Sequence, residues 1–149
     1  MWRNAIKIDV ESSNSIGTEP AIVIASLLRD NLSLHELDLR IINHTVAGIE
    51  LFAGAVVAKA LQNQCTEFGG MDVQALRSLV DVDLNSRNLG PLECVVLAKL
   101  IRHNSNLQTL NLKNNKLTVL SRGDDGEGTS YTALGVDALV DALQNRQEG

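Results

Sequence analysis

Hydrophobic residues return in one fixed frame along this chain. The clearest copy reads L-x-x-L-x-L-x-x-N-x-L without a gap from Leu107 to Leu117. The same frame recurs 28 residues upstream, where it falls on Leu79, Val82, Leu84 and Leu89. A third copy is centred on residues 34–39, and a degenerate fourth copy comprises Ile8, Val10, Asn14 and Ile16. The L-x-L core of each copy alternates between apolar and polar positions, which is typical of a short strand.

A second pattern follows each copy and aligns over 12 positions without a gap. The aligned segments are residues 20–31, 53–64, 93–104 and 135–146. Their fifth, sixth and ninth positions are apolar, a spacing that places them on one stripe of a helix. The seventh position is polar, so we expect it to face water: Ser26, Lys59, Lys99 and Asp141. Each unit is therefore predicted to be a strand followed by a helix. The longest apolar run, Val46 to Leu61, is predicted to be a buried helix.

The complete motif and the unit length resemble the ribonuclease-inhibitor-like subfamily of leucine-rich repeats. The resemblance implies an α/β solenoid of four repeats, a short horseshoe segment with a parallel sheet inside and helices outside. The repeats would be about residues 5–33, 34–75, 76–106 and 107–147, forming a single domain over 1–149. Asn14 and Asn115 fit the motif's asparagine position, where such residues normally satisfy loop backbone groups. Ile42 and Arg87 stand there in the middle repeats, so their loops are expected to be irregular.

Three insertions distinguish the units, near residues 42–48, 65–76 and 118–131. The last is rich in Gly, Ser and Asp and has the composition of a mobile segment. The middle insertion carries Phe68 and Met71, which either pack onto the sheet edge or anchor a partner. Insertions matter because binding residues concentrate on loops held by a rigid scaffold.

Charge and composition limit the classes of function. The net charge is −5 and Trp, Tyr and Phe together number four, which disfavours nucleic acid as a partner. No stretch is long and apolar enough to predict a membrane helix, and Met1 to Asn4 lead into charged residues rather than a signal segment. Two cysteines, Cys65 and Cys94, make no disulfide framework, so we expect buried thiols and a cytoplasmic location.

Candidate chemistry is sparse. The three histidines lie in different parts of the chain without ligand spacing, so we expect no metal, and no nucleophile or nucleotide motif predicts a cofactor or an enzyme. One indirect alternative is a GTPase-activating partner, because Ran GTPase-activating protein belongs to the same subfamily. The arginines near strand ends and loops are Arg40, Arg87 and Arg122, and no motif connects them with that role.

The concave sheet face is the predicted binding surface. Alternation along the strands places six acids and three bases there. The candidate partner-binding residues are Asp9, Glu11, Glu36, Asp38, Arg40, Asp81, Asp83, Asn85, Asn111 and Lys113. Stacked parallel strands would align Asp9, Asp38 and Asp83 in one column.

These features predict a non-enzymatic module that binds a partner protein with a basic surface through the acidic face and the rim loops. A structural subunit docked by its open ends is a further alternative. Uncapped repeat ends also predict self-association. The sequence identifies neither the partner nor the biological process.

Overall fold

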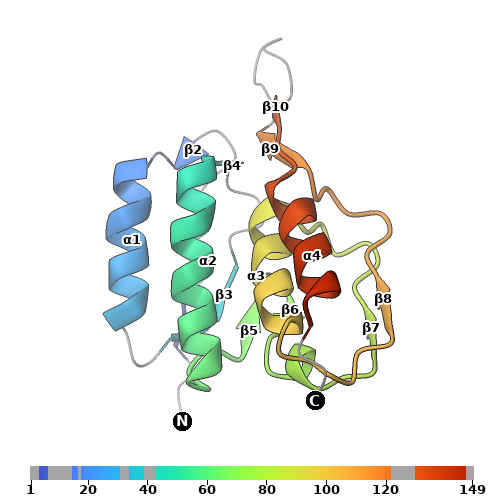
Figure 1. The fold of residues 1–149 in the computed structure, drawn as a ribbon. Helices are drawn as coiled ribbons and strands as arrows, with labels where there is room; N and C mark the ends of the chain where they lie inside the picture. The colour runs from blue at the N-terminus through green and yellow to red at the C-terminus, as the bar shows by residue number, and fades with distance from the viewer. Residues whose placement is uncertain are drawn as a thin grey trace.

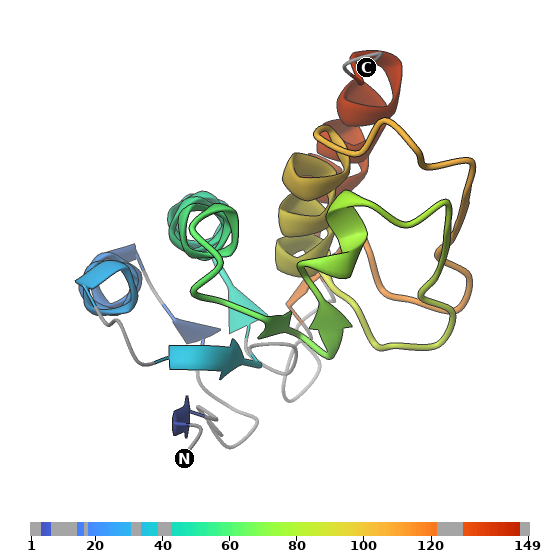
Figure 2. The same ribbon diagram turned by 90° about the horizontal axis from the view of Figure 1, so that it is seen from below.

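The computed structural model describes residues 4–6, 15–16, 18–30, 34–38, 43–121 and 130–146. The described residues form four helices. They stand side by side in chain order, and the strands lie along one side of this row (Figures 1 and 2). The helices are α1 (Thr18–Asp30), α2 (Val46–Leu61), α3 (Pro91–Ile101) and α4 (Leu134–Gln144). Each overlaps one of the four aligned segments. The pattern of hydrophobic positions therefore located all four helices.

Helix starts follow from local chemistry. The helix predicted over Val46 to Leu61 is α2, and the Thr45 hydroxyl caps it by accepting the Gly48 N–H at 3.1 Å. Helix α3 starts at Pro91, whose fixed φ suits the first turn, and the Glu93 carboxylate accepts the Gly90 N–H at 2.9 Å. The insertion near 42–48 is thus partly helix, because its last residues form the first turn of α2.

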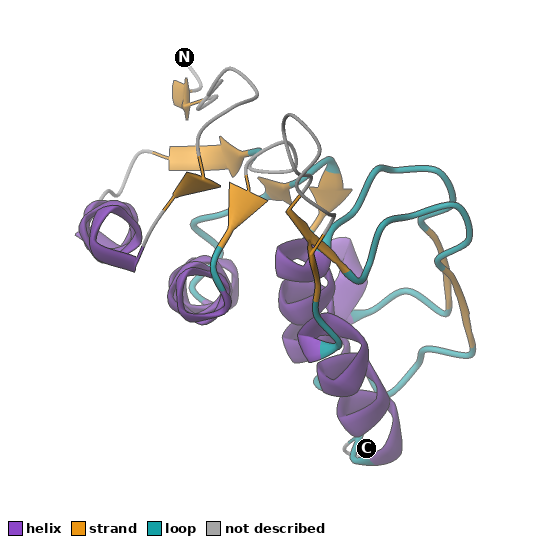
Figure 3. Cartoon of the chain, turned by 90° about the horizontal axis from the view of Figure 1, so that it is seen from above, coloured by secondary structure: helices purple, strands orange, loops and turns teal. Residues whose placement is uncertain are grey.

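The strands are short, and those in the described part of the chain form four small sheets (Figure 3). Parallel pairs join β1 (Asn4–Ile6) with β3 (Leu34–Leu37), β3 with β5 (Glu67–Phe68), β2 (Ser15–Ile16) with β4 (Asn43–His44), and β7 (Asp81–Asp83) with β8 (Thr109–Asn111). Antiparallel pairs join β5 with β6 (Met71–Asp72) and β9 (Val119–Ser121) with β10 (Ser130–Tyr131). A short 3₁₀ turn, η1, spans Ala75–Arg77.

One continuous parallel sheet, as a complete solenoid requires, is not formed by the described strands. The second neighbour of β3 is β5, from the 65–76 insertion, and β7 pairs only with β8 within the described residues. Gly69 and Gly70 have φ values of 56° and 76°, so they turn β5 back into β6 at low conformational cost. The expected column of Asp38 and Asp83 is therefore wrong, because Asp83 lies on β7 whereas Asp38 directly follows β3, a strand of another sheet.

The hydrophobic core is continuous across the repeats. Phe68 and Met71 of the insertion are 0% and 1% exposed and pack in the same cluster as Phe52 of α2. Packing, rather than partner anchoring, is therefore their role. Helix α3 lies at the centre, since every residue except Lys99 is buried.

Helices α3 and α4 approach closely at Gly135. A Cβ atom there would lie 2.8 Å from Cys94 Cβ and 3.0 Å from the Pro91 carbonyl oxygen. The aligned repeat therefore has glycine at this position because the neighbouring helix leaves no room for a side chain.

Two further expectations concern Lys59 and the 118–131 insertion. Lys59 is predicted to face water, but it is 4% exposed because the chain folds back after the end of α2. The N–H groups of Gln64 and Cys65 in this returning segment donate hydrogen bonds to the Lys59 carbonyl oxygen. The 118–131 insertion has the composition of a mobile segment, and its ends pair as β9 and β10. Its residues 122–129 lie outside the described part of the chain. None of the described helices is long and apolar enough to cross a membrane.

Candidate functional site

The structure brings together half of the predicted partner-binding residues. Five of them lie on β7, β8 and the turns that follow: Asp81, Asp83, Asn85, Asn111 and Lys113. Together with Thr109 they make up what we call the β7–β8 face. Glu36 lies on β3, in another sheet, and Asp38 directly follows that strand. Asp9, Glu11 and Arg40 lie outside the described residues.

Side chains on the β7–β8 face form cross-strand pairs. Asp81 lies opposite Thr109 and Asp83 opposite Asn111, the alignment that the 28-residue spacing predicts. The Thr109 hydroxyl donates to Asp81 Oδ1 at 2.6 Å, and Asn111 Nδ2 donates to Asp83 Oδ1 at 3.0 Å. Each acid is therefore held by a donor from the neighbouring strand.

The turns after both strands repeat one local arrangement. The Asn85 N–H donates to Asp83 Oδ1 at 3.0 Å, and the Lys113 N–H donates to Asn111 Oδ1 at 3.1 Å. Each is a turn in which a side chain binds the backbone two residues on. Asn114 Nδ2 then donates to Asn85 Oδ1 at 2.9 Å and joins the two turns. The polar side chains are thereby oriented before any partner arrives.

The polar groups remain accessible although they are ordered. Asp81 and Asp83 are exposed, whereas Val82 and Leu84 point to the other side and are 4% and 6% exposed. Within the described chain, the Oδ2 atom of neither aspartate takes part in a hydrogen bond. Each carboxylate can therefore accept a hydrogen bond from a partner without breaking the cross-strand pair.

Asn115 supports this face from below, as the motif predicts. Its Oδ1 accepts the N–H groups of Arg87 and Leu89 at 3.1 and 3.0 Å. Its Nδ2 donates to the carbonyl oxygens of Leu84 and Leu112 at 2.8 and 2.9 Å. The asparagine thus ties the loop of one repeat to the loop of the next, even though Arg87 replaces the equivalent asparagine upstream.

Asn104 has a comparable role that the sequence analysis missed. It is fully buried, and Nδ2 donates to the carbonyl oxygens of Leu76 and Leu79 at 2.9 and 2.8 Å. Its Oδ1 accepts the N–H groups of Asn106 and Leu107. The available signal was its place at the end of an aligned helix, three residues before the motif leucine Leu107.

The second group of acids has a different setting. Glu36 lies opposite Glu67 on neighbouring parallel strands, and Glu36 and Asp38 are both half-buried. Like charges opposite one another in a sheet are unfavourable. The predicted face of six acids is therefore divided in the structure, and only its β7–β8 part presents fully exposed carboxylates among the described residues.

The cysteines are buried thiols. Burial raises the pKa of Cys65 to about 11 and the pKa of Cys94 to about 12. Both thiols are therefore protonated at neutral pH, which makes them poor nucleophiles. The described residues contain no cluster of His, Cys, Asp and Glu that could hold a metal ion. Of the arginines considered for GTPase activation, Arg87 is exposed, and Arg40 and Arg122 lie outside the described residues.

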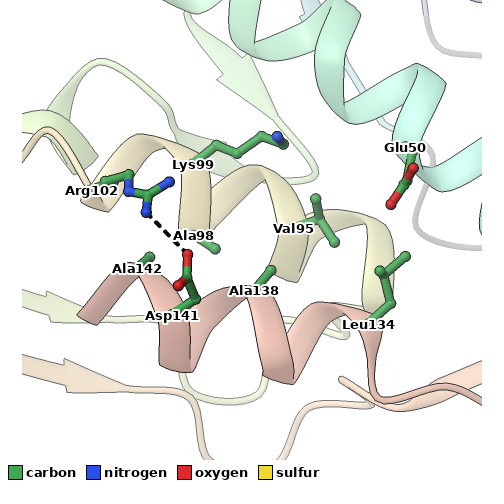
Figure 4. A pocket seen from close by; sticks show the side chains of 9 residues that line it. All are labelled: Glu50, Val95, Ala98, Lys99, Arg102, Leu134, Ala138, Asp141 and Ala142. Atoms are coloured by element: carbon green, nitrogen blue, oxygen red, sulfur yellow. Dashed lines mark hydrogen bonds and ion pairs between the residues drawn. The ribbon is translucent and has the colours of Figure 1, made fainter. Parts of the chain in front are cut away.

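A hollow of about 350 Å³ lies on the helical side of the molecule (Figure 4). Arg102, directly after α3, and Asp141 of α4 form an ion pair at 3.1 Å across it, and Leu134 and Glu50 lie toward the other end. Its floor is made of small residues on the facing helices: Val95, Ala98, Ala138 and Ala142. The hollow shows that α3 and α4 meet through small side chains and one exposed ion pair.

Comparisons of the chain with models of protein families, with curated proteins and with solved structures found no match.

Proposed function

We propose that this protein is a non-enzymatic interaction module of the leucine-rich-repeat type that binds a partner protein through the β7–β8 face. The observation that carries the proposal is the pair of exposed aspartates, Asp81 and Asp83, held in place by donors from the next strand. Side chains that are already ordered lose little conformational entropy on binding. Such a face favours recognition, since its hydroxyl and amide groups hold the two carboxylates in fixed positions.

The repeat interpretation is supported by hydrogen bonds that join residues one unit apart. Asn104 Nδ2 bonds the Leu76 carbonyl oxygen and Asn106 Nδ2 bonds that of Ser78, in both cases across 28 residues. The Asp81–Thr109 and Asp83–Asn111 pairs have the same separation. A stack of similar units produces this constant offset, because each residue meets its equivalent in the next unit.

A basic surface is the partner chemistry that fits best. The β7–β8 face carries two carboxylates and one ammonium group, that of Lys113, and the whole chain has a net charge of −5. Opposite charges accelerate association and make it sensitive to salt. Lys and Arg side chains of the partner would donate to the Oδ2 atoms of Asp81 and Asp83.

A cytoplasmic location is part of the same proposal. Cys65 and Cys94 are both free and buried, a condition that a reducing compartment preserves.

The test compares the proteins captured by three forms of the full chain. Asp81→Asn/Asp83→Asn removes two charges from the β7–β8 face and keeps the side-chain shape. The control, Glu50→Gln/Asp137→Asn, removes two charges from exposed positions on the helical side. Quantitative mass spectrometry should find proteins retained by the wild type and the control but lost from the first variant.

Binding of each such protein is then measured at low and moderate salt. The proposal predicts at least about a ten-fold weaker affinity for Asp81→Asn/Asp83→Asn and a smaller salt dependence, as for lost charge-assisted contacts. Equal capture and equal salt dependence for all three forms would reject the β7–β8 face as the binding site.

A further inference from the structure

Helix α1 presents an exposed apolar flank at one end of the helix row (Figure 1). Ile22, Val23 and Leu27 are 47%, 58% and 65% exposed. The residues that α1 turns inward, Ala25 and Leu28, are 2% and 5% exposed. The helix is therefore apolar on two sides, although only one of them is covered.

The repeat alignment shows what kind of surface this flank is. Its residues occupy the third, fourth and eighth of the 12 aligned helix positions. In α2 and α3, each of which follows another helix in the row, the same positions are at most 4% exposed: Ala55, Val56, Ala60, Val95, Val96 and Leu100. In α4, the fourth and eighth positions are Ala138 and Ala142, which line the hollow against α3 (Figure 4). In α4 these two positions face the preceding helix, and among the described residues no helix precedes α1.

The other end of the row shows the complementary half. Val140 and Leu143 of α4 are 48% and 41% exposed and hold the sixth and ninth aligned positions. In α1 and α3, the sixth and ninth positions are at most 5% exposed: Ala25, Leu28, Ala98 and Ile101. Ala98 lines the hollow against α4, so these positions pack against the following helix.

Helix α2 is an exception, because its sixth and ninth positions are not buried. Ala58 and Leu61, at its sixth and ninth positions, are exposed. The axis of α3 is turned away from that of α2 (Figure 2), whereas α3 and α4 lie closely against each other. The α3–α4 junction therefore serves as the template for which positions face each other in a regular contact. Its close spacing is not part of the template, because α1 has Pro20 at the position of Gly135.

We propose that a second copy of this chain covers the flank of α1, with α4 of one copy packed against α1 of the next. One end supplies the sixth and ninth positions, and the other supplies the fourth and eighth, the positions of α4 that face α3 within the chain. Ile22, at the third position of α1, adds apolar surface where α4 has the exposed Asp137. Charge does not oppose the contact. At the places that Arg102 and Asp141 occupy in the template, the new junction has Gln144 and Ser26, which are exposed and neutral.

The contact is head-to-tail, so it leaves one free α1 and one free α4 and extends to chains of molecules. It uses the helical side and leaves the β7–β8 face open, so it is independent of the proposed partner binding. A single helix pair buries less than the roughly 1,200 Å² of a stable interface, which predicts weak association.

Sedimentation velocity between about 10 and 500 μM, the range suited to weak contacts, tests the proposal. Wild type should sediment faster as concentration rises. Leu27→Glu and Leu143→Glu each place a charge at an exposed position of one end, and each variant alone should stay monomeric. Mixed together, they should form a dimer and nothing larger, because Leu27→Glu retains an unchanged α4 and Leu143→Glu retains an unchanged α1. Val46→Glu is the control, since Val46 is 44% exposed on α2 away from both ends, and it should associate like wild type.

Each other outcome decides against the contact. A monomeric wild type over the whole range overturns it. Loss of association in Leu27→Glu alone indicates a symmetric α1–α1 contact instead, and a mixture that stays monomeric excludes the head-to-tail arrangement. Circular dichroism of each variant verifies folding, and Leu27→Ser and Leu143→Ser replace any variant that melts earlier than wild type.

A gain of affinity provides a second readout. Ser26→Asp with Gln144→Arg in one chain rebuilds the Arg102–Asp141 pair at the junction between copies. This double variant should associate about two- to five-fold more tightly than wild type at low salt, as expected for one exposed ion pair. No gain, or an equal gain for either single change, contradicts the proposed register.

Discussion

The carboxamide oxygen of Asn115 accepts the backbone N–H of Leu89 at 3.0 Å, across 26 residues of the chain. The same oxygen also binds the Arg87 N–H, so one side chain fixes the course of the preceding loop. Because the loop lacks its own asparagine at position 87, its geometry depends on the neighbouring repeat. The β7–β8 face directly above it depends on the same bonds.

Replacing Asn115 should therefore cost more than its partial burial suggests. Asn115→Ala leaves two N–H groups and three carbonyl oxygens without this partner, and we expect a loss of about 2–4 kcal/mol in unfolding free energy. Asn106→Ala is the control, since this exposed side chain makes one long bond to Ser78 and should cost less than about 0.5 kcal/mol. Urea unfolding measures both, and equal losses would contradict the role of Asn115.

The close approach of α3 and α4 predicts opposite effects for two glycines. Gly135→Ala should destabilise the fold by about 1–3 kcal/mol, because its Cβ would meet Cys94 and the Pro91 carbonyl group. Gly54→Ala should stabilise it by up to about 1 kcal/mol, because nothing lies within 4 Å of that Cβ and alanine favours the helix. Thermal unfolding compares the two. A stabilising Gly135→Ala would show that the helices can separate without cost.

The inserted β5–β6 hairpin should be needed for stability. Phe68→Ala removes a fully buried ring and should lower the unfolding free energy by about 3–5 kcal/mol. The neighbouring change Glu67→Ala affects an exposed residue that faces Glu36, so we expect a change within about 0.5 kcal/mol of wild type. If Phe68→Ala melted like wild type, the ring would not belong to the core.

Alkaline pH should weaken the fold through the two cysteines. Burial raises the pKa of Cys65 to about 11 and that of Cys94 to about 12, from an ordinary value of 9.0. Above pH 9 the unfolded chain releases thiol protons that the folded chain still holds, so stability falls as pH rises toward the folded pKa. The loss should be about 1.4 kcal/mol per pH unit for each thiol. Urea unfolding from neutral pH to about pH 10.5, compared with Cys65→Ala/Cys94→Ala, measures it. If the unfolding free energy of Cys65→Ala/Cys94→Ala fell with pH as steeply as that of the wild type, the thiols would not be the cause.

Local patterns determined the helices and the equivalence of neighbouring repeats. The run from Val46 to Leu61 predicted α2 with its observed ends, because apolar spacing and a threonine cap act within a few residues of sequence. The 28-residue spacing predicted that Asp83 and Asn111 lie side by side, and the motif predicted that Asn115 holds the loops. The exposure of Asp81 and Asp83 follows from the alternation of apolar and polar residues along β7.

Tertiary structure alone decided which strands meet. Gly69 and Gly70 between Phe68 and Met71 could have indicated a hairpin, but nothing local showed that β5 would take the place beside β3 and separate Asp38 from Asp83. The burial of Lys59 likewise depends on the chain returning over the end of α2. Strand neighbours and returning segments are chosen by competition between distant parts of the chain for one apolar surface. The sequence therefore determined the helices and the repeat offset, whereas the final packing determined how far the acidic face extends.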